Sequence, residues 1–222
     1  MCRFPLLLGH RGARASAGIP ENSLQSFDLA LKQGCDGFEF DVRLSACGRA
    51  LVCHDPKVGG VSISRATCDD LPPLPECQTV LERYRQRGFL DIELKVRKLE
   101  AKVLSAIGEY PPERGYVVSS FLQDVILELR ARSEAAPVGL ICQRVNQLVR
   151  WPTLPVDYVI AHQSLLDRKL VHEVHDAGKK LFVWTVNDSK TMLRFAEWGV
   201  EGIIADDTQL LVNTLRPPER RV

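Results

Sequence analysis

Two acidic residues lie two positions apart in the stretch DGFEFDV. Side chains at positions i and i+2 of a β-strand point to the same face, so a strand here would place Glu39 and Asp41 together. In the later stretch LDIELKV, the same spacing pairs Glu93 with Lys95. Grouped carboxylates resist burial unless a cation lies among them, and oxygen ligands suit Mg²⁺ or Ca²⁺ better than zinc. We therefore expect a divalent-cation site at Glu39, Asp41 and Glu93.

Two histidines follow apolar runs, in the stretches PLLLGHRG and ALVCHD. Histidine exchanges a proton near neutral pH, so His10 and His54 suit general acid–base catalysis, which contributes roughly 10²–10⁴ in rate. The guanidinium of Arg11 matches the geometry of a phosphate, and Lys95 would add a second positive charge. Each residue alone could be a surface or ion-pair residue. Together, however, a metal site, two proton carriers and two cations favour phosphodiester cleavage.

The elements that position these residues are short apolar runs alternating with helical patterns. We expect strands at 5–9, 36–42, 89–94, 116–119, 138–142, 158–161, 181–186 and 202–205. Eight strands, each followed by a helix or a connector of helical length, predict an α/β fold with a parallel sheet. A compact TIM (β/α)₈ barrel fits this length, and an open doubly wound sheet is the alternative. No repeat or linker interrupts the pattern, so residues 1–222 are expected to form a single domain.

Two local patterns refine the expected fold. The first helical pattern covers 22–33 and stops at Gly34, and others cover 165–177 and 189–198, each followed by glycine. After the second strand, the stretch RLSACGRALVCHD contains a turn at 46–49 between two extended runs. The second strand should therefore fold back as a short hairpin that delivers His54 to the carboxyl end of the barrel. On strand 36–42, the aromatic side chains should pack outward under helices and leave the acids inside.

Composition excludes several classes of protein. The chain has 222 residues, 45% hydrophobic and 26% charged, with a net charge of +1. This balance is typical of a globular protein and argues against a nucleic-acid-binding one. No apolar stretch approaches the roughly 20 residues that span a bilayer, and the N-terminal apolar run is too short for a secretory signal. A cytoplasmic protein is expected. The seven cysteines include no C-x-x-C, which favours reduced thiols, although Cys47 and Cys53 could face each other across the hairpin.

The sequence resembles the glycerophosphodiester phosphodiesterase family, as a compact, cytosolic, bacterial-type member. The resemblance lies in six stretches that follow the family's order: GHRGARASAGIPENSLQSF, GFEFDVRLSACGRALVCHD, DIELK, VVSSF, VWTVN and GIIADD. It implies metal-dependent hydrolysis of glycerophosphodiesters, such as glycerophosphocholine or glycerophosphoethanolamine, to sn-glycerol 3-phosphate and an alcohol in lipid and glycerol metabolism. The roles it implies are metal ligands at Glu39, Asp41 and Glu93, acid–base catalysis by His10 and His54, phosphate binding by Arg11 and Lys95, pocket walls at Trp184 and Phe121, and site ordering by Glu21.

Departures from the family pattern leave alternatives open. The interval between His54 and Glu93 holds only 38 residues, a reduced insertion for the family. Asn22 could either order the site or cap the following helix, and His162 is a weaker candidate for the pocket. One rival is a phospholipase D-like hydrolase of lysophospholipids on the same barrel, and another is a non-catalytic barrel that binds a phosphorylated ligand. The segments after the strands read as polar or short, which favours a small-molecule, water-soluble substrate; the oligomeric state does not follow from the sequence.

Overall fold

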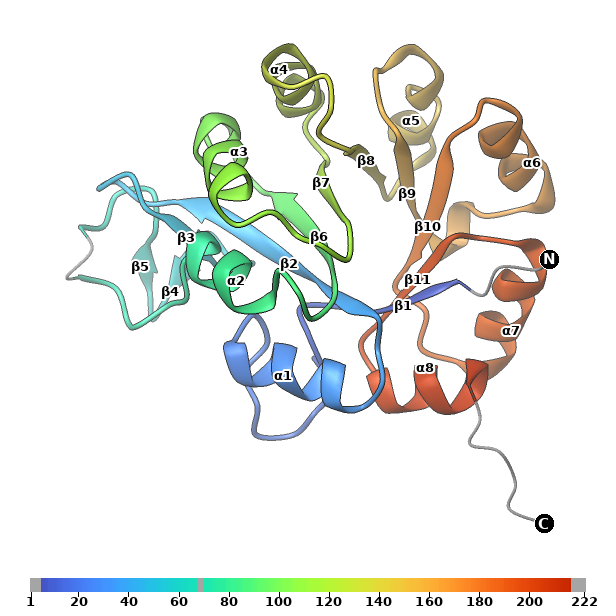
Figure 1. Cartoon of the computed structure of the whole chain (residues 1–222), viewed down its shortest axis with the longest axis horizontal. Coiled ribbons are helices and arrows are strands. Elements are labelled where there is room, and N and C mark those ends of the chain that lie inside the picture. Colours follow the sequence, from blue (N-terminus) through green and yellow to red (C-terminus); the bar gives the residue numbers. More distant parts are fainter. Residues whose placement is uncertain (1–4, 68–69, 217–222) are drawn as a thin grey trace.

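The computed structural model describes residues 5–67 and 70–216. Its main feature is a closed barrel of eight parallel strands, because β1 pairs with both β2 and β11 (Figure 1). The strands are β1 Leu6–Gly9, β2 Gly37–Leu44, β6 Phe89–Leu94, β7 Tyr116–Ser120, β8 Val138–Cys142, β9 Tyr158–His162, β10 Lys180–Trp184 and β11 Gly202–Ala205. The predicted TIM barrel is confirmed, and all eight predicted strands are present.

Helices follow the strands and surround the barrel (Figure 1). They are α1 Leu24–Lys32, α2 Cys77–Tyr84, α3 Glu100–Glu109, α4 Gln123–Arg132, α5 Val145–Leu148, α6 Arg168–Asp176, α7 Ser189–Trp198 and α8 Thr208–Leu215. Two of them begin later than predicted because a side chain caps the first turn. The Ser23 hydroxyl accepts a hydrogen bond from Ser26 N before α1, and Asp167 accepts one from Leu170 N before α6.

The two faces of β2 separate the core from the polar interior, as alternation predicts. Phe38 and Phe40 point outward, and Phe38 stacks on Phe27 of α1 with ring centroids 4.2 Å apart. The intervening Glu39 and Asp41 are buried inside the barrel. Below them, a second apolar cluster fills the barrel interior with residues Leu8, Phe89, Val117, Ile141, Tyr158, Ile160, Phe182 and Ile204. The acids therefore lie above an apolar floor.

The predicted hairpin is present after β2. The strand β3, Ala50–Val52, pairs antiparallel with the end of β2, so that Val42 faces Val52 and Leu44 faces Ala50. A small two-stranded ribbon of β4, Lys57–Val58, and β5, Val61–Ser62, follows it within the interval that the sequence marked as a reduced insertion. The hairpin returns the chain to the carboxyl end of the barrel at His54.

Two features relate to the predicted cellular environment: the oxidation state of the cysteines, and the length and polarity of the helices. Cys35, Cys53, Cys77 and Cys142 are free and buried, so Cys53 does not bond to Cys47. The prediction of reduced thiols throughout is wrong for Cys47, which is disulfide-bonded. Within residues 5–67 and 70–216, the helices are too short or too polar to cross a membrane.

Candidate active site

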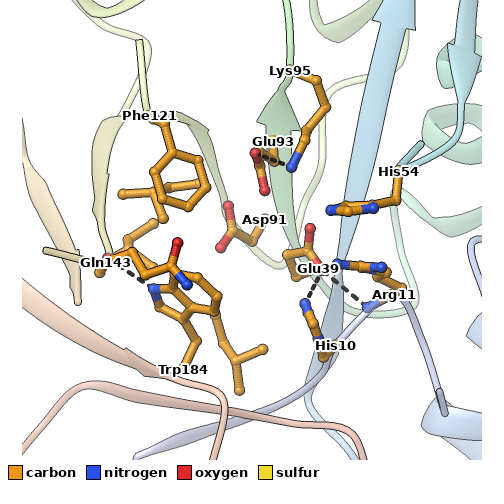
Figure 2. Close-up of a pocket in the computed structure, with 13 residues that line it drawn as sticks. His10, Arg11, Glu39, His54, Asp91, Glu93, Lys95, Phe121, Gln143 and Trp184 are labelled. Carbon is orange, nitrogen blue, oxygen red and sulfur yellow. Dashed lines mark hydrogen bonds and ion pairs between the residues drawn. The ribbon is translucent and has the colours of Figure 1, made fainter. Parts of the chain in front are cut away.

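A pocket of about 310 Å³ opens at the carboxyl ends of the barrel strands. In TIM barrels this end carries the active site, because the loops after the strands converge there. Figure 2 shows the side chains that line it. They are His10, Arg11, Glu39, His54, Asp91, Glu93, Lys95, Phe121, Ile141, Gln143, Ile160, Trp184 and Ile204.

A tight turn after β1 presents His10 and Arg11 to this pocket. A side chain on Gly9 would place its Cβ 2.5 Å from the carbonyl oxygen of Gly12. Gly12 has φ +80°, and a Cβ there would lie 2.3 Å from Ser26 Oγ. Glycine is needed at both positions because the backbone approaches so closely. Within the turn, the Arg11 backbone N–H donates to Glu39 Oε2 at 2.9 Å and ties the turn to β2.

Glu39, Asp41 and Glu93 form a compact acid cluster inside the barrel. Each offers an oxygen, and these atoms lie within 4.8 Å of one another. Burial, together with the nearby charge of Asp41, raises the pKa of both Glu39 and Glu93. Within the described residues, Glu39 Oε1 is buried without a hydrogen-bond partner. A hard divalent cation satisfies such a set of oxygens, so the residues present are suited to Mg²⁺ or Ca²⁺.

Two cationic side chains stand beside the acid cluster. Lys95 Nζ lies 2.7 Å from Glu93 Oε1 and 3.3 Å from Asp41 Oδ1. Arg11 Nε lies 3.2 Å from Asp41 Oδ2. Burial opposes ionisation of Asp41, but Lys95 and Arg11 outweigh it and hold the pKa of that carboxyl below its usual range. The pocket thus combines anionic oxygens on one side with cationic donors on the other.

Both histidines are held through Nδ1. His10 Nδ1 lies 2.7 Å from Asp206 Oδ1, and His54 Nδ1 lies 2.8 Å from Asp55 Oδ1. The other ring nitrogen of His10 points towards the acid cluster, since its Nε2 is 3.9 Å from Glu39 Oε2. Burial lowers the pKa of His54, and the charge of Asp41 offsets only part of that effect. A carboxylate at Nδ1 fixes the ring orientation and leaves Nε2 for proton exchange.

Asp206 is an acid that sequence reasoning missed. Burial opposes its ionisation, but hydrogen bonds from His10, Asn187 and Arg14 hold the pKa of its carboxyl well below the usual range. Asn187 Nδ2 donates to its Oδ2 at 2.7 Å, and Arg14 approaches its Oδ1 at 3.2 Å. Asp206 therefore carries a full negative charge against His10. Its position directly after the last strand was the available signal.

The apolar side of the pocket is built from two of the predicted aromatic residues. Phe121 and Trp184 meet edge to face with centroids 5.7 Å apart, and the indole N–H of Trp184 donates to Ile160 O at 3.2 Å. Lys95 Nζ lies 5.6 Å from the centre of the Phe121 ring. His162 packs against Trp184 outside the set of lining residues. The weaker candidate, His162, is therefore not part of the pocket wall.

The stretch PENS supports the site from outside the pocket. Glu21 accepts hydrogen bonds from Arg11 at 2.7 Å and from Arg14 at 2.6 Å. Asn22 does not cap α1, because Ser23 takes that position; instead its Nδ2 donates to Asp41 Oδ2 at 2.8 Å. Asn22 is thus a direct neighbour of the acid cluster.

Two further lining residues, Asp91 and Gln143, were also missed by sequence reasoning. Asp91 precedes Glu93 by two positions, so the alternation that pairs Glu93 with Lys95 also places Asp91 inside the barrel. That rule was the available signal for Asp91. Gln143 follows β8 and carries no such signal, because a lone exposed glutamine is an ordinary surface residue.

Comparisons with known proteins agree with this architecture. A model described as the glycerophosphoryl diester phosphodiesterase family matches residues 10–72 and 89–210. A glycerophosphodiester phosphodiesterase of Caldanaerobacter subterraneus subsp. tengcongensis is 29% identical over 240 residues, covering 95% of this chain and 98% of its own. A glycerophosphodiester phosphodiesterase structure from Thermotoga maritima has a TM-score of 0.80 at 26% identity, covering 95% of this chain and 98% of that one.

A further solved structure shares the fold. It is a phosphodiesterase of Oleispira antarctica in complex with the product sn-glycerol-3-phosphate, with a TM-score of 0.84 at 24% identity, covering 95% of this chain and 96% of that one. The closed barrel and its polar pocket define the class of protein, a TIM-barrel enzyme. Because the family model matches well over half of the chain, the protein belongs to the glycerophosphoryl diester phosphodiesterase family.

Proposed function

We propose that the protein hydrolyses glycerophosphodiesters such as glycerophosphocholine or glycerophosphoethanolamine to sn-glycerol 3-phosphate and an alcohol, in lipid and glycerol metabolism. The observation that carries this proposal is the meeting of His10 and His54 with a buried acid cluster in one pocket. Glu39, Asp41 and Glu93 would hold one Mg²⁺ or Ca²⁺. When bound, the cation would polarise a phosphoryl oxygen.

Acid–base catalysis is the proposed task of the two histidines. One histidine takes the proton of the glycerol hydroxyl next to the phosphoester, and that oxygen forms a new bond to phosphorus. The bond from phosphorus to the alcohol oxygen breaks, and the second histidine donates a proton to that oxygen. The resulting cyclic glycerol phosphate is opened by water, with the two histidines exchanging roles. Asp206 and Asp55 keep each ring oriented through Nδ1.

The remaining site residues bind the substrate. Arg11 and Lys95 would bind the phosphate, because both cations line the pocket beside the acid cluster. Glu21 orders Arg11 through a hydrogen bond to its guanidinium. Phe121 and Trp184 would pack against the carbon atoms of the substrate, which needs an apolar surface on that side.

Organisation and location complete the proposal. Residues 1–222 would form one catalytic domain that acts on a small molecule and binds no nucleic acid, consistent with the net charge of +1. A cytoplasmic location is supported by the free thiols of Cys35, Cys53, Cys77 and Cys142 and opposed by the disulfide at Cys47. Cell fractionation with an antibody against the protein decides this point.

The direct test is release of glycerol 3-phosphate from glycerophosphocholine by the purified protein. We expect no turnover in EDTA, recovery with added Mg²⁺ or Ca²⁺, and loss of activity in His10→Ala and Glu39→Ala. Glu100→Ala is the matched control, since Glu100 is a buried acid on α3 outside the pocket. A folded wild-type protein without turnover in either metal, on any glycerophosphodiester, would refute the proposal.

One observation favours a second candidate, hydrolysis of lysophospholipids. The segments that follow the pocket-lining residues Phe121 and Gln143 are not wholly polar, because Leu122 is 36% exposed and Val145 and Val149 are each 63% exposed. Exposed apolar side chains beside a pocket can contact lipid. Turnover of lysophosphatidylcholine at a rate equal to that of glycerophosphocholine would favour this candidate.

A further inference from the structure

Asp91 is a buried acid in the pocket to which the reaction described above gives no role. It lies on β6 with no exposed surface, and its partner in the sheet register is Glu39 on β2. Although it lines the pocket, its Oδ2 atom has no hydrogen-bond partner within the described residues. A buried polar oxygen without a partner is rare in a native structure and calls for a ligand or a specific role.

The orientation of this carboxyl group is fixed from behind. Ser119 on β7, itself fully buried, donates its hydroxyl hydrogen to Asp91 Oδ1 at 2.5 Å. Because Oδ1 already accepts this hydrogen bond, Oδ2 is the oxygen of Asp91 that can bind a ligand in the cavity. Figure 2 shows the Asp91 carboxyl between Glu39 and the side of the pocket formed by Phe121, Gln143 and Trp184.

Asp91 shares the pocket with apolar side chains as well as with the acid cluster. The lining residues Ile141, Ile160 and Ile204 offer no hydrogen bond. Asp91 also lies outside the group of three acids whose oxygens approach within 4.8 Å of one another. A polar group of the substrate is therefore a better partner for Oδ2 than the cation at that cluster.

We propose that Asp91 is a specificity-determining residue that binds the terminal hydroxyl of the glycerol moiety. This inference rests on the proposed function and names its substrate class: diesters with an unacylated glycerol. A carboxylate accepts a hydrogen bond from a hydroxyl, and a protonated carboxyl donates one, so the pairing is available in either form. The hydroxyl that attacks phosphorus is the one next to the phosphoester, and the terminal hydroxyl is carried by the next carbon, further from phosphorus.

The same contact would disfavour lysophospholipids, the second candidate substrate, relative to glycerophosphodiesters. Acylation of the terminal oxygen removes the hydroxyl hydrogen and adds an acyl group at the position where Asp91 would bind. The acyl chain would also have to begin next to Asp91, a residue with no exposed surface. A buried polar group left without its partner penalises the wrong substrate more strongly than a missing apolar contact does.

Two substrates with the same leaving alcohol test the inference. Glycerophosphocholine and 2-hydroxyethyl phosphocholine both keep a hydroxyl next to the phosphoester, and only the former carries the terminal hydroxymethyl group. We expect wild-type kcat/KM to favour glycerophosphocholine by about 10- to 100-fold, the effect of one buried hydrogen bond to a carboxylate. Asp91→Ala should bring this ratio to within about 3-fold of unity. Asp91→Asn should retain most of the ratio, because its amide still bonds to a hydroxyl.

Control variants separate this role from a structural one. Glu100→Ala removes a buried acid outside the pocket and should leave the ratio unchanged. If Asp91→Ala lowers activity on both substrates equally, Asp91 is structural and the inference is wrong. If Asp91→Asn selectively impairs glycerophosphocholine relative to glycerophosphoglycerol, the carboxylate binds the choline cation instead, and the inference is also wrong.

A binding measurement separates the role of Asp91 from the proposed hydrolysis of glycerophosphodiesters. Calorimetry with glycerol 3-phosphate and with 2-hydroxyethyl phosphate needs no turnover. If the wild-type protein binds glycerol 3-phosphate more tightly than 2-hydroxyethyl phosphate, and Asp91→Ala loses this preference, the inference is supported. This result would support the inference even if no diester were hydrolysed, and only the proposed function would then fail. Equal affinity of the wild-type protein for both phosphates overturns the inference.

Discussion

Replacement of Asp206 tests how the site controls His10. The carboxylate lies 2.7 Å from His10 Nδ1, and the His10 and Asp206 side chains are only 10% and 21% exposed. A hydrogen bond to a charged group in such a setting contributes about 1.5–3 kcal/mol, which corresponds to about 10- to 150-fold in rate if it acts in the transition state. We therefore expect Asp206→Ala to lower kcat for glycerophosphocholine by about 10- to 150-fold.

The assay must separate orientation of His10 from general damage. Asp207→Ala is the matched control, because the neighbouring acid caps α8 by accepting a hydrogen bond from Leu210 N. It should lower the free energy of unfolding by about 1 kcal/mol and leave kcat nearly unchanged. In Asp206→Ala, the affinity for glycerol 3-phosphate should persist while kcat falls. A folded Asp206→Ala protein whose kcat stays within about 2-fold of wild type would refute the reasoning.

Three further outcomes follow from the structure. Asn22→Ala removes the amide that binds Asp41 Oδ2, so calorimetry should show about 10-fold weaker binding of Mg²⁺ or Ca²⁺; unchanged affinity would contradict this. The pKa values of Glu39 and Glu93 are raised in the folded protein, so the unfolded chain loses these two protons at a lower pH than the folded protein does. In EDTA, the free energy of unfolding should therefore fall as pH rises from about 4.5 to about 7. Glu39→Gln should make this fall smaller. Phe38→Ala should lower the free energy of unfolding by about 3–5 kcal/mol in urea denaturation, whereas a loss below about 1 kcal/mol would contradict the stacked packing against α1.

The pH prediction depends on opposing contributions. For the two glutamates, the folded state binds more protons than the unfolded state in this window, so stability falls with rising pH. His54 has the opposite sign, since burial lowers its pKa and the unfolded state binds the proton more readily. His54 is only half-buried and is one group against three, since burial also raises the pKa of Asp91 to about 7, so the buried acids dominate. Bound Mg²⁺ or Ca²⁺ should remove the fall, because it favours the ionised carboxylates.

The barrel could be predicted from sequence because its signals are local. Each buried strand is a short apolar run, and alternation alone assigns Glu39 and Asp41 to the interior and Phe38 to the exterior. The same rule reaches Asp91, which was missed because a pairing of Glu93 with Lys95 already explained that strand. The start of α6 was misplaced because the capping role of Asp167 depends on one hydrogen bond rather than on periodicity.

Asp206 could not be assigned in the same way. Its partner His10 is 196 residues away, and the two meet only because β1 and β11 are adjacent when the barrel closes. Two neighbouring acids, Asp206 and Asp207, end that strand, and their different tasks are set by orientation alone. One contacts His10 and the other caps a helix, a distinction that no spacing rule contains.

The stretches HRG and ENS form one structural unit, which explains why both carry backbone strain. Arg11 and Asn22 have φ values of 53° and 55°, a left-handed conformation that costs residues other than glycine about 1 kcal/mol or more. The Arg11 carbonyl accepts hydrogen bonds from Asn22 N and from Ser26 Oγ, both at 3.0 Å. These bonds hold the two turns together, so that Arg11 N reaches Glu39 while the Asn22 amide reaches Asp41. The strain is therefore the local cost of holding both acids of β2 from one side, which leaves Glu39 Oε1 without a hydrogen-bond partner among the described residues and Asp41 Oδ1 3.3 Å from Lys95 Nζ.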